Sequence, residues 1–249
     1  MIYYEIDLMV IIFVAVFFGA VIKGAVGIGL SLFSVPVITF FLPPTSSMIL
    51  LCIPVLITNI LQMEIQKGAR SFRFFPMFIT LVIGIILGCN LILQVQLKTI
   101  SQIIAISIIF AATVNLFGIN LKFIKPHFEK IFTMFLGFFS GIIGGLSNMY
   151  APYILCYLVS TDLNKEDLIR TIAAMYLIGS VIIFPIWIYN GLGTINDLIL
   201  SSLLLVPALL GQKIGTKIRD KISNKNFKRI ILYILMVIGI TLLIKNIKS

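Results

Sequence analysis

Long uninterrupted runs of apolar residues constrain this chain more than any other sequence feature. A helix needs about 20 apolar residues to cross the hydrocarbon core of a bilayer. Hydrophobic residues make up 60% of the 249 residues and charged residues only 11%, against about 25% charged in soluble domains. The sequence therefore predicts an all-α, polytopic membrane protein. Its apolar stretches are 6–42, 46–66, 74–97, 100–121, 130–160, 167–190, 195–216 and 228–247.

Two of these stretches are too long for one helix, and each contains the motif Gly-Leu-Ser-x-x-x-x-Pro. One copy runs from Gly29 to Pro36 and the other from Gly145 to Pro152. Each glycine inside a helix costs about 1 kcal/mol relative to alanine, so we expect the helix to break at each copy. Splitting both stretches gives about ten helical segments. Interruptions at corresponding places in two halves of a chain indicate the binding site of a secondary transporter.

The second broken stretch is short for two helices. About 29 residues between Ile131 and Val159 leave about 14 for each arm, or about 21 Å at 1.5 Å per residue. The hydrocarbon core is about 30 Å thick, so we expect a re-entrant hairpin with its tip near the middle of the membrane. The first pair is longer, and there both two full spans and a hairpin fit the sequence.

Basic residues gather in three of the connections, which places those connections on the cytoplasmic side. Counting spans from them predicts that both termini lie outside. The net charge of +10 is laid out in these connections and not as a patch for nucleic acid, so no nucleic-acid partner is expected. The basic residues are Lys67, Arg70, Arg73, Lys122, Lys125, Lys130, Lys213, Lys217, Arg219, Lys221, Lys225, Lys228 and Arg229.

The chain divides into two halves of similar build. Residues 1–121 and 130–249 each consist of a broken hairpin followed by three spans, and they cross the membrane in opposite directions. We therefore expect one transmembrane transporter domain, residues 1–249, made of two inverted five-segment repeats. The penultimate span of each half carries a ladder, Gly84-x-x-x-Gly88 or Gly211-x-x-x-Gly215. Such ladders favour close helix packing, within one chain or across a homodimer.

The two breaks can supply an anion site without a charged side chain. Ser is a favoured N-cap, and Ser31 and Ser147 stand where the second arm of each hairpin is expected to start. A helix N-terminus there offers free N–H donors and the positive end of the helix dipole. The glycines at the breaks either approach a substrate or only permit packing. The candidate substrate-binding residues are Lys23, Gly27, Gly29, Ser31, Gly144, Gly145, Ser147 and Asn148.

Several polar residues inside apolar stretches have two interpretations. Lys23 either faces a bound anion in the membrane interior or extends to the cytoplasmic surface as an interfacial anchor. Tyr150 either donates to a bound oxyanion or makes a structural hydrogen bond. The other polar residues, which either line the path or bond a neighbouring helix, are Asn59, Asn90, Asn115 and Ser180.

Signatures of enzymes and of cofactor sites are absent from the sequence. It contains no Gly-x-x-x-x-Gly-Lys-Ser/Thr motif for ATP, and its single histidine and few intramembrane acids argue against a metal centre. The three cysteines lie in apolar runs without Cys-x-x-Cys spacing. We therefore expect no catalytic residues, no metal and no cofactor.

The glycine patterns resemble those of the sulfite exporter TauE/SafE family. The resemblance covers nearly the whole chain and rests on Gly19 to Pro36, Gly137 to Pro152, the two glycine ladders and Arg170 to Ala174. It implies export of sulfite, an organosulfonate or a related sulfur anion across the plasma membrane. The chain departs from the family pattern at Gly27-Ile28-Gly29, which replaces a continuous glycine run.

Together these features predict a secondary transporter that exports a small anion by alternating access. Its expected partners are the anionic substrate and the lipid bilayer. Two alternatives belong to other classes. In an anion channel the same helix ends would line a pore and the flux would not saturate, whereas a membrane scaffold would bind no small anion.

Overall fold

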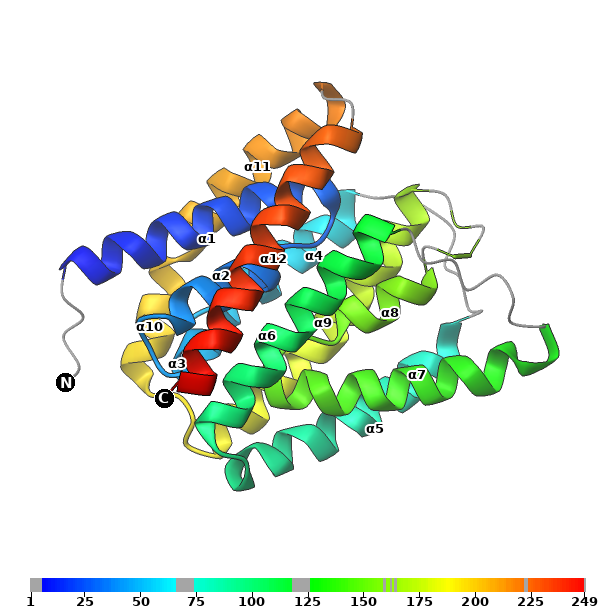
Figure 1. Ribbon diagram of the computed structural model, residues 1–249, viewed down its shortest axis with the longest axis horizontal. Helices are drawn as coiled ribbons and strands as arrows, with labels where there is room; N and C mark the ends of the chain where they lie inside the picture. The colour runs from blue at the N-terminus through cyan, green and yellow to red at the C-terminus, as the bar shows by residue number, and fades with distance from the viewer. Residues whose placement is uncertain are drawn as a thin grey trace.

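The computed structural model describes residues 6–65, 74–117, 126–158, 160–161, 163, 165–221 and 224–248, and this part of the chain contains helices and no strands (Figure 1). In chain order the elements are α1 (Ile6–Val26), α2 (Leu30–Thr39), α3 (Pro44–Ile49), α4 (Cys52–Ile65), α5 (Phe75–Leu91), the 3₁₀ helix η2 (Ile92–Gln94), α6 (Leu97–Phe117), α7 (Pro126–Ser147), α8 (Ala151–Leu158), α9 (Lys165–Tyr189), α10 (Ile195–Leu203), α11 (Leu205–Lys221) and α12 (Asn224–Lys248).

Within the described ranges, seven helical segments are long and apolar enough to cross a membrane. Two of them join neighbouring elements, α3 with α4 as Pro44–Met63 and α10 with α11 as Ile195–Arg219. Large apolar side chains such as Phe18 and Val206 are exposed on the outside of the bundle, as expected for a surface whose solvent is lipid. The prediction of an all-helical, multi-pass membrane protein is confirmed.

Both broken stretches form hairpins with one long and one short arm. The first consists of α1, with 21 residues, and α2, with 10. The second consists of α7, with 22 residues or about 33 Å, and α8, with 8 residues or about 12 Å. The expectation of two arms of about 14 residues is therefore wrong. It failed because α7 already begins at Pro126, in a segment with charged residues, and ends only at Ser147.

A seam of small residues joins α1 to α11. Gly211 lies against Phe17 and Ala20, and Gly215 lies against Val21 and Gly24, so the two helices run parallel. A Cβ atom added to either ladder glycine would come under 3.0 Å from the backbone or side chain of α1. The ladder is therefore a packing feature, as the sequence predicted.

A second seam of the same kind joins α5 to α7, again in parallel. Gly84 lies against Phe138 and Gly141, and Gly88 lies against Ile142 and Gly145. Each seam thus combines the helix before one break with a ladder helix from the other half of the chain. The remaining close helix pairs include α4 with α9 and α6 with α12.

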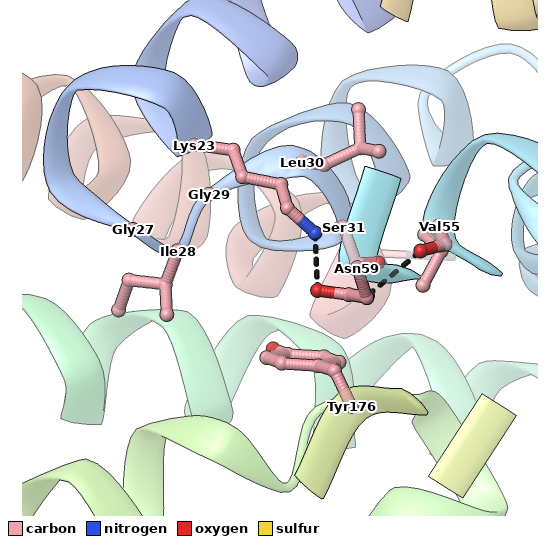
Figure 2. Close-up of a pocket in the computed structure, with 9 residues that line it drawn as sticks. All are labelled: Lys23, Gly27, Ile28, Gly29, Leu30, Ser31, Val55, Asn59 and Tyr176. Carbon is pink, nitrogen blue, oxygen red and sulfur yellow. Dashed lines mark hydrogen bonds between the residues drawn. The ribbon is translucent and has the colours of Figure 1, made fainter. Parts of the chain in front are cut away.

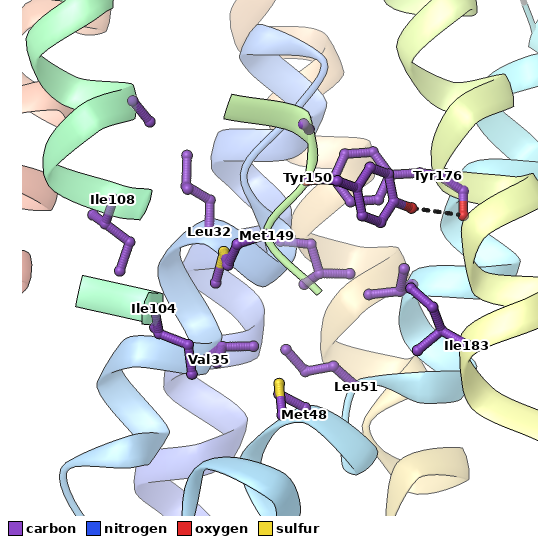
Figure 3. Close-up of a cluster of buried hydrophobic side chains, with 14 of the residues drawn as sticks. Leu32, Val35, Met48, Leu51, Ile104, Ile108, Met149, Tyr150, Tyr176 and Ile183 are labelled. Atoms are coloured by element: carbon purple, nitrogen blue, oxygen red, sulfur yellow. Dashed lines mark hydrogen bonds between the residues drawn. The ribbon is translucent and has the colours of Figure 1, made fainter. Parts of the chain in front are cut away.

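The hydrophobic core fills the space between the two hairpins. Figure 3 shows Leu32 and Val35 of α2 beside Met149 of the second break and Ile104 of α6, all buried. Because both hairpins enter this core from different sides, their tips are held inside the bundle, away from lipid.

The beginning of α1 and the end of α12 lie at the same side of the bundle (Figure 1). Near the end of α12, Lys245 Nζ donates to the carbonyl of Phe40, 2.8 Å away in the turn after α2. Asn190, after α9, donates to the carbonyl of Cys89 near the end of α5 at 3.4 Å. The connections of this side are the ones predicted to be poor in charge. Five of the basic residues used for orientation lie outside the described residues: Lys67, Arg70, Arg73, Lys122 and Lys125.

Candidate functional site

The first break comprises residues 27–29, between α1 and α2. Gly27 has φ 96° and Gly29 has φ 145°, a region that residues with a side chain rarely adopt. Gly29 is the N-cap of α2, without a side-chain hydrogen bond, and Ser31 is the second residue of that helix. Ser31 is thus not the cap that the sequence suggested. The first N–H groups of α2 have no acceptor within the helix and are available to a ligand.

The second break comprises residues 148–150, between α7 and α8. Ser147 is the last residue of α7, and its Oγ donates to the carbonyl of Ile143 at 2.7 Å. The expectation that Ser147 caps the second arm is therefore wrong. Asn148 follows with φ 57°, and its N–H donates to the carbonyl of Gly144 at 2.6 Å. The bend of the second hairpin therefore rests on a non-glycine residue.

The two breaks meet inside the protein. Asn148 Nδ2 donates to Ser31 Oγ at 3.4 Å, and both side chains are buried. The Oδ1 atom of Asn148 is buried without a hydrogen-bond partner. This contact brings the two breaks together in the interior of the described chain.

The two Gly-Leu-Ser copies do not occupy corresponding places in the fold. Gly24 and Gly145 do correspond, because each faces the second glycine of its seam, Gly215 or Gly88. The first break therefore precedes its Gly-Leu-Ser copy, whereas the second break follows its copy. The repeated motif identified the two regions in which the helices break. The residues at which the helices end are set by packing and differ between the two copies.

A narrow, partly open pocket lies beside the first break. Four of the predicted site residues line it: Lys23, Gly27, Gly29 and Ser31 (Figure 2). The opposite wall comes from Val55 and Asn59 of α4 and Tyr176 of α9.

Lys23 projects into this pocket from the last turn of α1. Only 4% of its surface is exposed, and Nζ donates to Oδ1 of Asn59 (Figure 2). Nζ also lies 6.0 Å from the ring centroid of Tyr176. Lys23 is therefore not an interfacial anchor, because the hairpin directs its side chain inward.

The counter-charge of Lys23 is absent from the part of the chain that the structure describes. No carboxylate among these residues forms an ion pair with Nζ. Asn59 supplies a neutral oxygen, and its own Nδ2 donates to the carbonyl of Val55 at 2.7 Å. An ammonium group buried inside a protein is costly and normally pairs with an anion.

The candidates of the second break are not among the residues that line the pocket. Gly145 packs against the backbone of α5, and its carbonyl accepts a hydrogen bond from Trp187 Nε1 at 3.0 Å. A Cβ on Gly144 would lie under 3.0 Å from the ring of Tyr150. In the second hairpin that ring therefore occupies the space next to Gly144, the residue that corresponds to Lys23.

Tyr150 and the other polar candidates mostly make structural hydrogen bonds. The Tyr150 hydroxyl donates to the carbonyl of Tyr176 at 3.2 Å (Figure 3). Ser180 also donates to that carbonyl, at 2.6 Å, and Asn90 is exposed. The side chain of Asn115 lies outside the described residues.

Two pocket residues had no signal in the sequence. Val55 lies in an apolar helix without a motif, and Tyr176 lies just after the segment Arg170 to Ala174. Only the approach of α4 and α9 to the first break brings both residues to the pocket. Asn59 was one of several intramembrane amides, distinguished from the rest only by its contact with Lys23.

The arrangement combines one amine, a hydroxyl and a free helix N-terminus around a small space, which is the chemistry of anion binding. Among the described residues, no group of three His, Cys, Asp or Glu side chains could hold a metal ion.

Comparison with known proteins identifies the family. The family model described as sulfite exporter TauE/SafE matches residues 11–242, nearly the whole chain. No match was found among curated proteins or among solved structures. Members of this family are membrane transporters associated with export of sulfite and related sulfur anions. The chain belongs to the sulfite exporter TauE/SafE family.

Proposed function

We propose that this protein is a secondary transporter of the plasma membrane that exports a small sulfur oxyanion, such as sulfite or an organosulfonate, by alternating access. The substrate occupies the pocket beside the first break. The observation that carries this proposal is Lys23, a buried cation that forms no ion pair with a described carboxylate.

The pocket offers three kinds of donor to one anion. Lys23 supplies positive charge, the N-terminus of α2 supplies backbone N–H groups, and Ser31 supplies a hydroxyl. Nδ2 of Asn148 can only donate, so Ser31 Oγ accepts from it and keeps its own proton for the pocket. Gly27 and Gly29 let the anion approach the backbone. Gly144, Gly145 and Ser147 support the second hairpin and do not touch the substrate.

The proposed movement uses two inverted repeats, residues 1–121 and 130–249, with both termini outside. The pairing of helices supports this organisation. The contact of α1 with α11 has its counterpart in that of α7 with α5, while α4 meets α9 and α6 meets α12. Such an arrangement allows one bundle to rock against the other around a fixed central site.

Replacement of Lys23 tests the site. In proteoliposomes, Lys23→Met should reduce saturable sulfite flux at least 30-fold, because losing the charged partner of a buried ion costs about 2–5 kcal/mol. The matched control is Lys98→Met, at an exposed lysine in the first turn of α6, which should keep the wild-type flux. Equal flux in both variants would place the anion elsewhere, and wild-type flux that never saturates would indicate a channel.

A further inference from the structure

Lys23 is also placed to carry a proton. Among the described residues that line the pocket, Lys23 carries the one amine, and Tyr176 is the one other titratable group. Asn59, its hydrogen-bond partner, is neutral in every state. The charge close to the amine of Lys23 therefore changes most when an anion binds in the pocket or leaves it.

When the pocket is empty, the described groups packed around Lys23 supply no negative charge to balance its ammonium group. In the described chain, α2 contributes no titratable side chain, α9 contributes the phenol of Tyr176, and α4 contributes the amide of Asn59. From α11, the guanidinium of Arg219 donates to the carbonyl of Gly24, one residue along. The charged group that these contacts bring close to Lys23 is thus Arg219, another cation.

A buried ammonium without counter-charge carries a large desolvation penalty, which the neutral amine avoids. A bound anion supplies the missing counter-charge and favours the ammonium. Occupancy of the pocket and protonation of Lys23 are therefore linked.

We propose that Lys23 takes up one proton with each monoanion and releases it with that anion on the other side, so that transport is electroneutral. The amine nitrogen gains a proton when the anion binds, the ammonium and the anion cross as a neutral pair, and the empty protein returns with the amine. This inference rests on the proposed function and names its coupling ion. The proton comes from the side where the anion binds and leaves with it, so export follows the combined concentration gradients of the anion and the proton and gains nothing from the membrane potential.

The direct test uses wild-type protein in proteoliposomes with sulfite as the probe. The pH is equal on both sides and acidic enough to keep sulfite as the monoanion bisulfite, and valinomycin sets a potassium diffusion potential of about 100 mV. Electroneutral transport predicts an accumulation ratio near one. If Lys23 stays charged throughout the cycle, a monoanion accumulates about 50-fold, which corresponds to about 2.3 kcal/mol. Protein-free liposomes measure the passive leak of sulfite and are subtracted.

The variant Lys23→Arg provides the second measurement, because a guanidinium does not deprotonate. Exchange of labelled for unlabelled sulfite needs no return of the empty protein, whereas net flux does. We expect the ratio of net flux to exchange to fall at least tenfold in Lys23→Arg. A wild-type ratio in this variant, or 50-fold accumulation by the wild type, overturns the proton coupling alone. Absence of saturable sulfite flux in the wild type overturns the proposed function as well.

Discussion

At the scale of single residues, Lys23 shows what one sequence can and cannot reveal. Its position in an apolar stretch identified it as unusual, yet both an interior and a surface location were compatible with the pattern. The choice depends on where α1 ends and on which way α2 turns back. Those are settled by the packing of Gly24 against α11 and by the positive φ values of Gly27 and Gly29, which no local pattern encodes.

Asn59 holds Lys23 in place, and its removal should weaken substrate binding. In Asn59→Leu, we expect the KM for sulfite to rise about tenfold, the equivalent of one hydrogen bond to a charged group at about 1.5 kcal/mol. Asn90→Leu is the matched control, since Asn90 also donates to the carbonyl four residues earlier but is exposed. An unchanged KM in Asn59→Leu would show that substrate binding does not depend on the hydrogen bond by which Asn59 positions Lys23.

Asn148 bends the second hairpin with a left-handed backbone. Glycine adopts φ 57° freely, whereas a β-branched residue meets a penalty of roughly 1–2 kcal/mol there. Asn148→Val should therefore lower the free energy of unfolding by that much more than Asn148→Gly does. Thermal unfolding in detergent measures the difference, and equal stability of the two variants would contradict the role of the bend.

At the scale of elements, hydropathy located the spans well because the thickness of a bilayer fixes their length. It failed at the ends of α7 and α8, where the charged residues near Pro126 continue a helix and the break follows Ser147. Helix ends inside a membrane protein depend on the groups that satisfy the freed backbone. Here those groups come from distant segments, as when Gln62 Nε2 donates to the carbonyl of Gly27 at 3.0 Å.

The seam between α1 and α11 should tolerate no added methyl group. A Cβ at position 215 would meet the carbonyl of Val21 and the backbone of Gly24, so Gly215→Ala should destabilise the protein by roughly 1–3 kcal/mol. Its neighbour Ile214 is exposed on the same helix, and Ile214→Ala should have little effect. The melting temperatures of the two purified variants are compared. A larger decrease in melting temperature for Ile214→Ala than for Gly215→Ala would contradict the packing role of the seam.

At the scale of the whole molecule, the basic connections predict the orientation in the membrane, with both termini outside. In a cysteine-free background, Asn196→Cys, at the exposed start of α10, should react with an impermeant maleimide on intact cells. Lys217→Cys, exposed near the end of α11, should react only after permeabilisation. The reverse pattern would place both termini in the cytoplasm.

The seams also determine how the chain can be divided. Each joins a helix from the first half to one from the second, α1 to α11 and α5 to α7. A fragment of residues 1–121 expressed alone would therefore present two glycine-lined grooves with nothing to fill them, and so would a fragment of residues 122–249. We therefore expect that neither half folds stably on its own. Stable assembly would then await synthesis of the second half, after the first half has entered the membrane.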